Sequence, residues 1–460
     1  MLALALACCG AACGPAAHGG HTVALDDPGE TGAGAGATAD AGPAPAGLRR
    51  EPTPRERSAL DRVVRVTERI RELTFVRSVP MRVEDRATIS AGVASDLEQD
   101  EIERARTLYV ALGLLAPDLD IRALLVRLLG EQVVGYYDPE TGIFAVRDDV
   151  MRELGRRGLA EGLDEAWIVL VHELVHALQD QRLGLGEVYE VERDTDADNA
   201  FHALVEGDAT LAMIGYVARA ANVPLEHFTR DPDTLRRLIG SSGPLPGDEL
   251  ARAPAIVRVP LVSSYLDGMI FAAALHGVGG WSAVDRAHRL PPVSTEQTMH
   301  PEKYVAGEQP DALTLPAIAP LDAHGLTVAR ETTLGELEMG VYFGSAMAEA
   351  AARRAAAGWG GDRLRVYRDA AGATSVVWLT TWDDEHEATE AASAARQVNN
   401  ATVARSGTTG AVEQRGRAVV VLRDVQTDLA PAVRAAVLAS IAALPAAPPR
   451  GPRPVLDGAP

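Results

Sequence analysis

One apolar segment constrains the fold of this chain more than any other. Residues 165–182 read EAWIVLVHELVHALQDQR, and three polar side chains interrupt the bulky apolar residues. This pattern predicts a helix buried on nearly all sides. Because residues four apart lie on the same helix face, His172 and His176 point in the same direction, with Glu173 beside them. Such groups are costly to bury unless they are hydrogen-bonded or bound to a metal.

Residues 172–176 read HELVH, an HExxH motif whose spacing suits zinc. Neutral imidazoles hold zinc at about 2.0 to 2.1 Å, and the ion lowers the pKa of its remaining water to about 7. A neighbouring carboxylate then takes the proton of that water during attack on a carbonyl. We therefore expect His172 and His176 to bind Zn²⁺ and Glu173 to act as general base. The alternative is a pair of hydrogen-bonded core histidines that bind no metal.

Zinc needs a third protein ligand, and the sequence after the motif narrows the choice. A metzincin would carry a glycine and a third histidine where this chain has Gln179 and Arg182. An inverted HxxEH motif is absent as well. We therefore expect a glutamate on a second helix downstream, within residues 198–216, which read DNAFHALVEGDATLAMIGY.

Glu206 is the expected third ligand on that second helix. Small Gly207 and Ala209 flank it, and small residues let two helices approach closely enough for a short carboxylate to reach a metal on the neighbouring helix. His202, one turn earlier, and Asp208, two residues later, are the competing ligands. The remaining alternative is an exposed Glu206 carboxylate with no ligand role.

Four motifs occur in order along the chain: LLGEQVVGYYDPETG, VHELVHALQDQ, ALVEGDAT and PPVSTEQTMHPEKY. With them, about residues 55–400 resemble a family of bacterial zinc metallopeptidases of the gluzincin, or peptidase MA-like, type, whose substrates are not established. The resemblance implies a zincin-like catalytic domain that binds Zn²⁺ and hydrolyses peptide bonds in a peptide or protein substrate. The chain departs from the family at Thr210, because gluzincins often place an aspartate there to orient a histidine.

The first of these motifs predicts a β-hairpin. Residues 133–137 and 143–146 are rich in β-forming side chains, and residues 138–142 read DPETG, which is a turn sequence. In gluzincins an edge strand above the active-site helix binds extended peptide by strand addition, so the resemblance implies a substrate rim at this hairpin. A hairpin that only covers the core is the alternative.

A peptidase of this kind also needs a hydrogen-bond donor for the oxyanion of the tetrahedral intermediate. The sequence offers His300, Tyr265 and Tyr304, of which His300 and Tyr265 rank first. Lys303, three residues after His300, is the only lysine in the chain. All other lysine or arginine residues of the chain are arginines. A single lysine among arginines suggests a site that requires a compact ammonium group.

Charge excludes one broad class of partner. The net charge is −20 and the pI about 5.0, and no basic stretch with interleaved aromatic residues occurs, which excludes a general nucleic-acid-binding protein. The acidic residues 190–198 read EVERDTDAD and predict a solvated loop before the second helix. A calcium site at Asp194, Asp196 and Asp198 is the alternative, although the stretch lacks the glycine and glutamate of a known calcium loop.

The three cysteines, Cys8, Cys9 and Cys13, all lie within the apolar residues 1–13. An apolar start followed by small residues and cysteine predicts a bacterial lipoprotein signal, with a lipidated cysteine as membrane tether on an exported envelope protein. Residues 14–47 are rich in Gly, Ala and Pro and predict a disordered linker. An apolar tail on a cytoplasmic protein is the alternative. No later apolar run is expected to span a bilayer, and no obligate protein partner is evident.

Composition divides the rest of the chain into two regions of a mainly helical α+β protein. We expect a zincin-like metallopeptidase domain at 48–320, an α+β accessory domain at 325–445 and a disordered tail at 446–460. Besides the hairpin and the metal-binding helices, the first region should contain helices at 54–74, 101–114, 121–129, 265–276 and 282–290. The second should contain helices at 333–357 and 385–399, a turn at 359–362, and strands at 363–368, 375–382 and 417–425.

The expected function is that of a gluzincin-type zinc metallopeptidase, and two alternatives stay open. A non-catalytic, zinc-binding envelope lipoprotein would have a closed site with four protein ligands, with His202 joining the other three. A zinc hydrolase that acts on a non-peptide amide of the cell wall would share the metal chemistry of a peptidase. The residues of the motif do not separate these last two activities.

Overall fold

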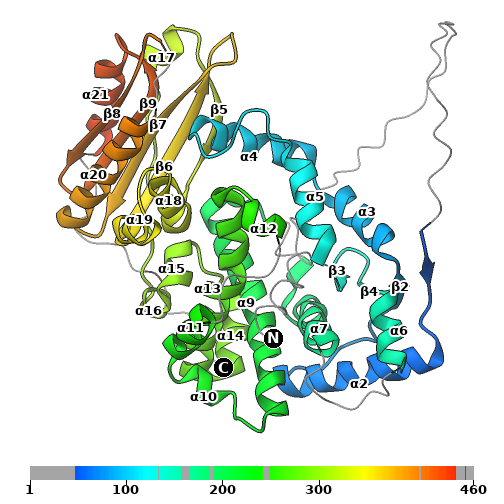
Figure 1. The fold of residues 1–460 in the computed structure, drawn as a ribbon. Helices are drawn as coiled ribbons and strands as arrows, with labels where there is room; N and C mark the ends of the chain where they lie inside the picture. The colour runs from blue at the N-terminus through cyan, green and yellow to red at the C-terminus, as the bar shows by residue number, and fades with distance from the viewer. Residues whose placement is uncertain are drawn as a thin grey trace, which may run out of the picture.

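The structure is a computed structural model, and it describes residues 47–132, 134–156, 165–186, 191–241, 248–402, 406–441 and 451. It is mainly helical with two β-sheets, which confirms the expected α+β class. The sheets lie at opposite sides of the molecule, with the long helices between them (Figure 1). The predicted signal at 1–13, and all but one residue each of the predicted linker and tail, lie outside the described residues.

Four short strands form the first sheet: β1 (Arg49–Arg50), β2 (Met81–Glu84), β3 (Gly135–Asp138) and β4 (Ile143–Arg147). Their order is β1-β2-β4-β3, with β2 and β4 parallel and the other pairs antiparallel, so β3 is an edge strand. The expected hairpin is confirmed as β3 and β4. The Asp138 carboxylate holds its turn by accepting hydrogen bonds from the Glu140 amide at 2.9 Å and the Thr141 hydroxyl at 2.6 Å.

Helices surround this sheet, and local capping fixes the ends of one of them. α2 (Pro54–Arg71) begins with a capping box, in which the Thr53 hydroxyl accepts from the Glu56 amide and the Glu56 carboxylate accepts from the Thr53 amide. It ends at Arg71, before the predicted residue 74, because the next residue, Glu72, has a left-handed backbone with a φ of 58°. The neighbouring helices are α3 (Arg86–Asp96), α4 (Gln99–Ala111), α5 (Ile121–Gln132) and α6 (Asp148–Arg156).

Three long helices form the centre of the molecule: α7 (Glu165–Leu183), α9 (Thr195–Ala220) and α13 (Ala255–Gly279). α7 carries the HExxH motif, and α9 is the predicted second helix. α9 and α13 meet backbone to backbone, because a Cβ on Gly207 would lie 2.1 Å from the Gly268 carbonyl oxygen. A Cβ on Gly268 would likewise lie 2.1 Å from the Ala203 oxygen. The glycine beside Glu206 thus serves the approach of α13, and not that of α7 as the sequence led us to expect.

α13 is longer than predicted. It begins at Ala255 instead of residue 265 and continues through Pro260. We expected no apolar run beyond the N-terminus to be able to span a bilayer. By length and apolar composition alone, however, α13 could do so, and it is the one such helix among the described residues. Half of its apolar window is buried inside the molecule, and a core helix of a folded protein meets the same criteria. α13 makes its most extensive packing contact with α9.

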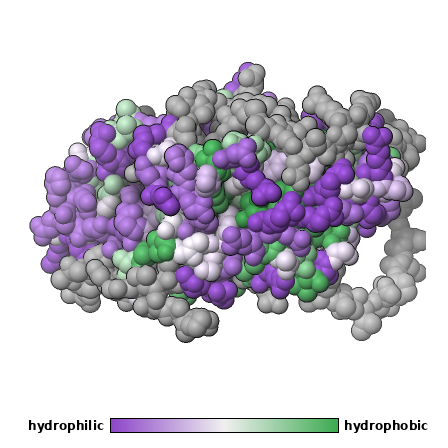
Figure 2. Space-filling view, turned by 90° about the horizontal axis from the view of Figure 1, so that it is seen from below, coloured by the Kyte–Doolittle hydropathy of each residue, from purple (hydrophilic) through white to green (hydrophobic). Residues whose placement is uncertain are grey.

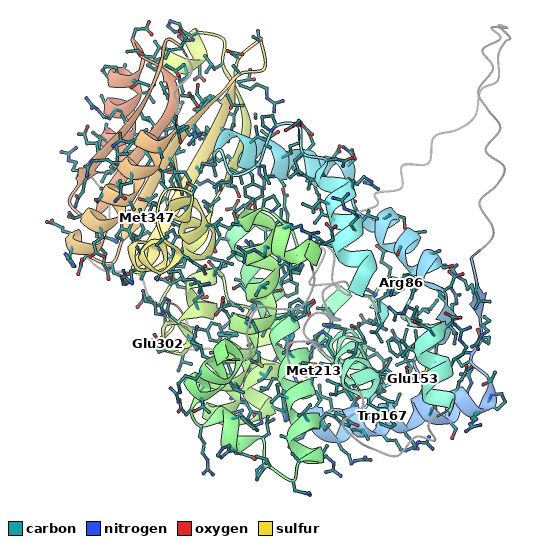
Figure 3. The ribbon with its side chains drawn as sticks, viewed as in Figure 1. Arg86, Glu153, Trp167, Met213, Glu302 and Met347 are labelled. Carbon is teal, nitrogen blue, oxygen red and sulfur yellow. The ribbon has the colours of Figure 1, made fainter. Side chains whose placement is uncertain are left out.

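The core beside the first sheet lies between α2, α7 and α9. Trp167 of α7 and Met213 of α9 both belong to it and project into the interior of this part of the molecule (Figure 3). The face of the molecule in Figure 2 is mainly hydrophilic, with hydrophobic residues in small separate areas. The shorter helices of this region are α10 (Glu226–Thr229), α11 (Pro232–Ser241), α12 (Asp248–Arg252), α14 (Trp281–Arg289), α15 (Thr295–Met299), α16 (Pro301–Ala306) and α17 (Ala319–Ala323).

The second sheet is antiparallel throughout, with the order β5-β6-β7-β9-β8. Helices α18, α20 and α21 pack against its strands. Its strands are β5 (Thr327–Thr332), β6 (Trp359–Arg368), β7 (Thr374–Trp382), β8 (Thr408–Arg415) and β9 (Ala418–Gln426), and its helices are α18 (Gly335–Gly344), α19 (Glu349–Ala356), α20 (Glu385–Ala401) and α21 (Ala430–Ser440).

Two expectations for this second region are wrong. Residues 359–362 do not form a turn but begin β6, because the glycine pair makes a β-bulge, with a register shift between Trp359 and Gly361 and a φ of 157° at Gly361. The helix expected at 333–357 is instead two helices, α18 and α19, with irregular backbone at 345–348.

Candidate metal centre

Three side chains from α7 and α9 converge on one point. His172 Nε2 lies 3.2 Å from His176 Nε2 and 3.1 Å from Glu206 Oε2, and His176 Nε2 lies 3.7 Å from the same oxygen. All three side chains are buried, with at most 2% of the surface of each residue exposed. The four-residue spacing puts both rings on the face of α7 that packs against α9. The structure therefore brings together the three residues that the sequence proposed as ligands.

The donor atoms fit a zinc ion. Ligands at about 2.0 to 2.1 Å in a tetrahedral arrangement lie roughly 3.4 Å apart, and the three separations of 3.1, 3.2 and 3.7 Å bracket that spacing. Hydrogen bonds alone do not satisfy these three atoms. A single proton on His172 Nε2 would have to be shared between two acceptors, His176 Nε2 and Glu206 Oε2. A cation between the three atoms satisfies all of them.

The competing ligands lie apart from this group. His202 Nδ1 is 3.0 Å from the Asp198 carbonyl oxygen, and Asp208 is engaged by Arg71 and His288. Neither side chain joins a set whose ligand atoms lie within 4.8 Å of one another in the part of the chain that the structure describes. Glu206 is therefore the residue that completes the candidate group.

The alternative calcium stretch is not a cluster of ligands either. Asp194 pairs with Arg363 at 2.7 Å. Asp196 accepts hydrogen bonds from the amide and the hydroxyl of Thr295, at 2.9 and 2.6 Å. The carboxylates of Asp194 and Asp196 thus take different partners, and none of the candidate metal groups within the described ranges contains Asp194, Asp196 or Asp198.

Glu173 lies next to His172 on α7 and is completely buried. Neither of its carboxylate oxygens has a hydrogen bond of regular geometry within the described part of the chain. Burial raises its pKa well above the usual value, the charge of Glu206 adds to the rise, and the backbone amide of Tyr137 opposes it. A carboxylate with a raised pKa, next to a candidate metal and close to edge strand β3, is suited to act as a general base.

Of the three oxyanion candidates, Tyr265 has a described contact with the triad, the group of His172, His176 and Glu206. Its ring, on α13, is stacked on that of His172 at a centroid distance of 5.9 Å. His300 lies between α15 and α16, where its Nε2 is 3.0 Å from Glu336 of α18, and this carboxylate raises the pKa of the imidazole. The Tyr304 hydroxyl donates to the Leu290 carbonyl oxygen at 2.7 Å. The described contacts of His300 are thus with an acid of the second region, and none of them joins it to His172, His176 or Glu206.

Gln179 orients one of the candidate ligands. Its Nε2 donates to the Val205 carbonyl oxygen and to Asp208 Oδ2, both at 3.0 Å, which fixes the direction of the amide. Its Oε1 must then accept from His176 Nδ1, 2.9 Å away, so Nε2 of His176 keeps a lone pair that faces Glu206 and His172. A signal for this role is present in the sequence, since Gln179 lies one turn after His176 on a buried helix.

A buried ion cluster lies behind Gln179. Arg71 Nε is 2.6 Å from Asp208 Oδ1, and His288 Nε2 is 2.9 Å from Asp208 Oδ2. Although burial alone would raise it, the charge of Arg71 and the hydrogen bond from His288 hold the pKa of Asp208 well below its usual range. Arg71 also contacts Asp285 at 2.5 Å and lies over the Trp281 ring, 4.5 Å from its centroid.

Thr210 is separate from this cluster and takes no part in it. The Thr210 hydroxyl is buried and has no hydrogen-bond partner among the residues with described coordinates, so it orients no histidine. Gln179 and Asp208 reach His176 from another direction. Sequence reasoning missed Arg71 and His288, because they lie far from α7 in the chain and neither belongs to a motif.

A comparison with protein families matches residues 325–438, and the matching family is described as a domain of unknown function, DUF8575. The match covers the second sheet with its helices and does not include the metal centre. No curated protein matches the chain, and no solved structure does.

Proposed function

We propose that this protein is a zinc-dependent metallopeptidase of the gluzincin type. The observation that carries the proposal is the ring of three donor atoms, His172 Nε2, His176 Nε2 and Glu206 Oε2, at separations of 3.1 to 3.7 Å beside Glu173. In this proposal the two imidazoles and the Glu206 carboxylate hold the zinc. Three protein ligands leave a fourth position open, which is the arrangement of catalytic zinc sites.

The residues around that open position supply the remaining chemistry. A bound zinc would make an attacking water more acidic and polarise the scissile carbonyl. Glu173 accepts the proton of the water at its carboxylate and passes it to the leaving nitrogen. Tyr265, whose ring lies beside His172, is the proposed hydrogen-bond donor to the oxyanion.

Strand β3 is the proposed peptide-binding rim. It is an edge strand of the first sheet, and the backbone amide of its residue Tyr137 lowers the pKa of Glu173. An extended substrate added along this edge would lie close to the general base, with its backbone hydrogen-bonded to the strand. This placement favours a peptide over a non-peptide amide. The position of His202 speaks against a closed four-ligand structural site, because its ring contacts Asp198 instead of the triad.

The direct test is the metal content of the full-length chain, measured together with hydrolysis of a mixed peptide library. We expect about one zinc per chain, loss of zinc in Glu206→Gln, and in Glu173→Gln retention of zinc with cleavage reduced by a factor of roughly 10² or more. His202→Gln is the matched control and should keep both properties. Zinc retained in Glu206→Gln would refute the ligand set, and zinc-loaded protein that cleaves nothing would refute the peptidase.

We also propose that the chain is exported and tethered through one of Cys8, Cys9 and Cys13. All three cysteines lie outside the described residues. Metabolic labelling with a radioactive fatty acid, in the natural chain and in the three single Cys→Ser variants, tests this proposal. Label lost in one variant alone identifies the acceptor, and a natural chain without label refutes the tether.

A further inference from the structure

One cavity is lined by none of the residues of the candidate metal centre. It has a volume of about 280 Å³, at the small end for ligand sites. It is enclosed by the first turns of α13, by α18 and α19, and by the turn that follows α4. In Figure 1 these helices lie side by side below the second sheet. The cavity therefore sits where the region matched as a domain of unknown function meets the rest of the chain.

The wall of this cavity is mainly apolar. Five branched aliphatic side chains contribute to it, from three separate parts of the chain: Leu114, Ile256, Val259, Leu337 and Val341. Gly340 and Gly344, four residues apart on α18, lie along the same side. A Cβ on Gly340 would meet nothing closer than the Ala356 Cβ at 3.9 Å, and one on Gly344 nothing closer than the Ala352 Cβ at 3.8 Å. The two glycines thus leave space for a ligand and are not required by close packing.

Most of the charges around the cavity are already paired. Glu336 is 3.0 Å from His300 Nε2, and Glu349 is 3.0 Å from Arg353. Arg258 is the exception, because its guanidinium has no hydrogen bond or ion pair within the described ranges, and its Nε is buried. An arginine at an apolar cavity without an acid partner leaves a positive charge uncompensated. The anion that fits a guanidinium best is a carboxylate or another planar, bidentate acceptor.

We propose that this cavity binds a small carboxylate with a short apolar chain. The carboxylate pairs with the Arg258 guanidinium, and the chain lies against the aliphatic wall and over Gly340 and Gly344. Two sources share this chemistry: a free monocarboxylate, and a peptide that ends in apolar residues. The proposal does not depend on the metal centre or on peptidase activity.

Occupation of the cavity would act on both regions of the molecule. The ligand would contact α13 through Arg258 and α18 through the glycine face. Tyr265, which stacks on His172, lies two helical turns after Arg258 on the same helix. A bound carboxylate would therefore hold α13 against the second region at one end, while α13 contacts the metal centre further along.

The test is calorimetric titration of the full-length chain with n-octanoate and with N-acetyl-leucyl-leucine. We expect saturable binding of at least one, a rise in the unfolding temperature with ligand, and much weaker binding of n-octanol and n-octylamine. If octanoate binds more tightly than the dipeptide, the natural ligand is a free monocarboxylate. If the dipeptide binds more tightly, the natural ligand is the C-terminus of a peptide. Equal binding of n-octanol or n-octylamine, or no saturable binding of either carboxylate, would overturn the proposal.

Two variants separate the site from general stability. Arg258→Met should lower the affinity for octanoate by about 10- to 100-fold, as expected for the loss of a charge-assisted hydrogen-bonded pair. Gly340→Leu should fill the space and abolish binding while leaving the unfolding temperature unchanged or higher. Arg252→Met, at an exposed arginine outside the cavity, is the matched control. Undiminished octanoate binding in Gly340→Leu would refute the location even if Arg258→Met failed to fold.

Discussion

Gln179 is the residue through which the proposed ligand His176 is connected to the core. It bridges the imidazole to Asp208, and Asp208 is held in turn by Arg71 and His288. Outer partners of this kind fix the tautomer and the direction of a metal-binding ring. At the scale of single residues, affinity for the proposed zinc should therefore depend on a side chain that is not itself a proposed ligand.

We predict that Gln179→Leu lowers zinc affinity by about 10- to 100-fold, because His176 loses the acceptor that fixes its tautomer. Competition with a chelator of known affinity measures the effect. Gln179→Glu keeps an oxygen that can accept from His176, so its zinc affinity should lie between those of Gln179→Leu and the natural chain. The control is Gln181→Leu on the same helix, since Gln181 accepts hydrogen bonds from Val76 and Arg77 and not from a histidine. Equal affinity in Gln179→Leu and the natural chain would contradict the assigned role.

The sequence predicted the parts of the site that local geometry determines. His172 and His176 were predictable because helical spacing alone aligns them. Glu206 was chosen because small residues flank it, although Gly207 serves the approach of α13 and not that of α7. Gln179 served only to exclude one class of motif, although a buried amide needs partners. The partner of His300 was not predictable, because nothing near it in the chain indicates Glu336, which lies on a helix of the second region.

At the scale of secondary-structure elements, the contact between α9 and α13 sets where Glu206 sits. The two helices touch through Gly207 and Gly268, so the residue next to the proposed ligand has no room for a side chain. The position of a proposed metal ligand is in this way tied to a helix that contributes none of the proposed ligands.

We predict that Gly268→Ala destabilises the fold by about 2 kcal/mol or more, because the added methyl would lie 2.1 Å from the backbone oxygen of Ala203 and the helices must separate. Zinc affinity should fall as well, since Glu206 moves with α9. Gly215→Ala, on the same helix as Glu206, is the milder comparison, because its methyl meets the movable Ile70 side chain at 2.9 Å. Urea denaturation compares the three proteins, and equal stability of Gly268→Ala and the natural chain would contradict this account.

Helices and strands with an uninterrupted sequence pattern were predictable. Those that contain a glycine pair or a proline in their interior were not. The hairpin turn carries its own signal in Asp138 and Gly142, and both strands were found. The pair Gly360-Gly361 has the same composition as a turn but forms a bulge inside a strand, a distinction that depends on the partner strand. α13 was predicted too short because Pro260 resembles a helix boundary.

At the scale of the whole molecule, a single ammonium group joins the two regions. Lys303 Nζ lies 2.6 Å from Glu296, 2.6 Å from Asp383 and 3.0 Å from Glu308. Asp383 follows β7 of the second sheet, whereas the other acids belong to the first region. A compact ammonium suits three converging carboxylates better than a planar guanidinium does, which agrees with the expectation from its isolation among arginines.

We predict that Lys303→Met destabilises the protein by about 3 to 5 kcal/mol, because it leaves partly buried carboxylates facing one another without a cation. Lys303→Arg should destabilise the protein less than Lys303→Met does. The positive charge remains, although a planar guanidinium fits the three carboxylates less well than an ammonium group. The control is Arg353→Met, whose exposed ion pair with Glu349 should contribute less than about 1 kcal/mol. Chemical denaturation measures all three, and a loss in Lys303→Met no larger than in the control would refute the bridging role.

Three buried acids near the same boundary make stability depend on pH. Burial raises the pKa of Asp196 to about 7, of Glu338 to about 8 and of Asp362 to about 6. Between the ordinary carboxyl value and these raised values, the folded state binds more protons than the unfolded state. Stability should therefore fall, by on the order of a few kcal/mol, as the pH rises from about 5 to about 8.

Urea unfolding at closely spaced pH values tests this prediction. Glu338→Gln should flatten the curve above neutral pH, because the amide keeps an oxygen that can accept from Tyr109 and Asn199 but does not titrate. A stability that increases between pH 5 and 8 would show that these acids are ionised in the folded protein.

The apolar character of α13 has a consequence for how the chain is made. An exposed helix of this hydropathy would be a target for chaperones and a candidate to halt in a translocation channel. Its packing partner α9 precedes it in the chain, so the surface that covers α13 is synthesised about a few seconds earlier at ordinary elongation rates. A circular permutant opened at residue 222, which places α13 ahead of α9, should therefore aggregate during expression even though it could form the same contacts once complete.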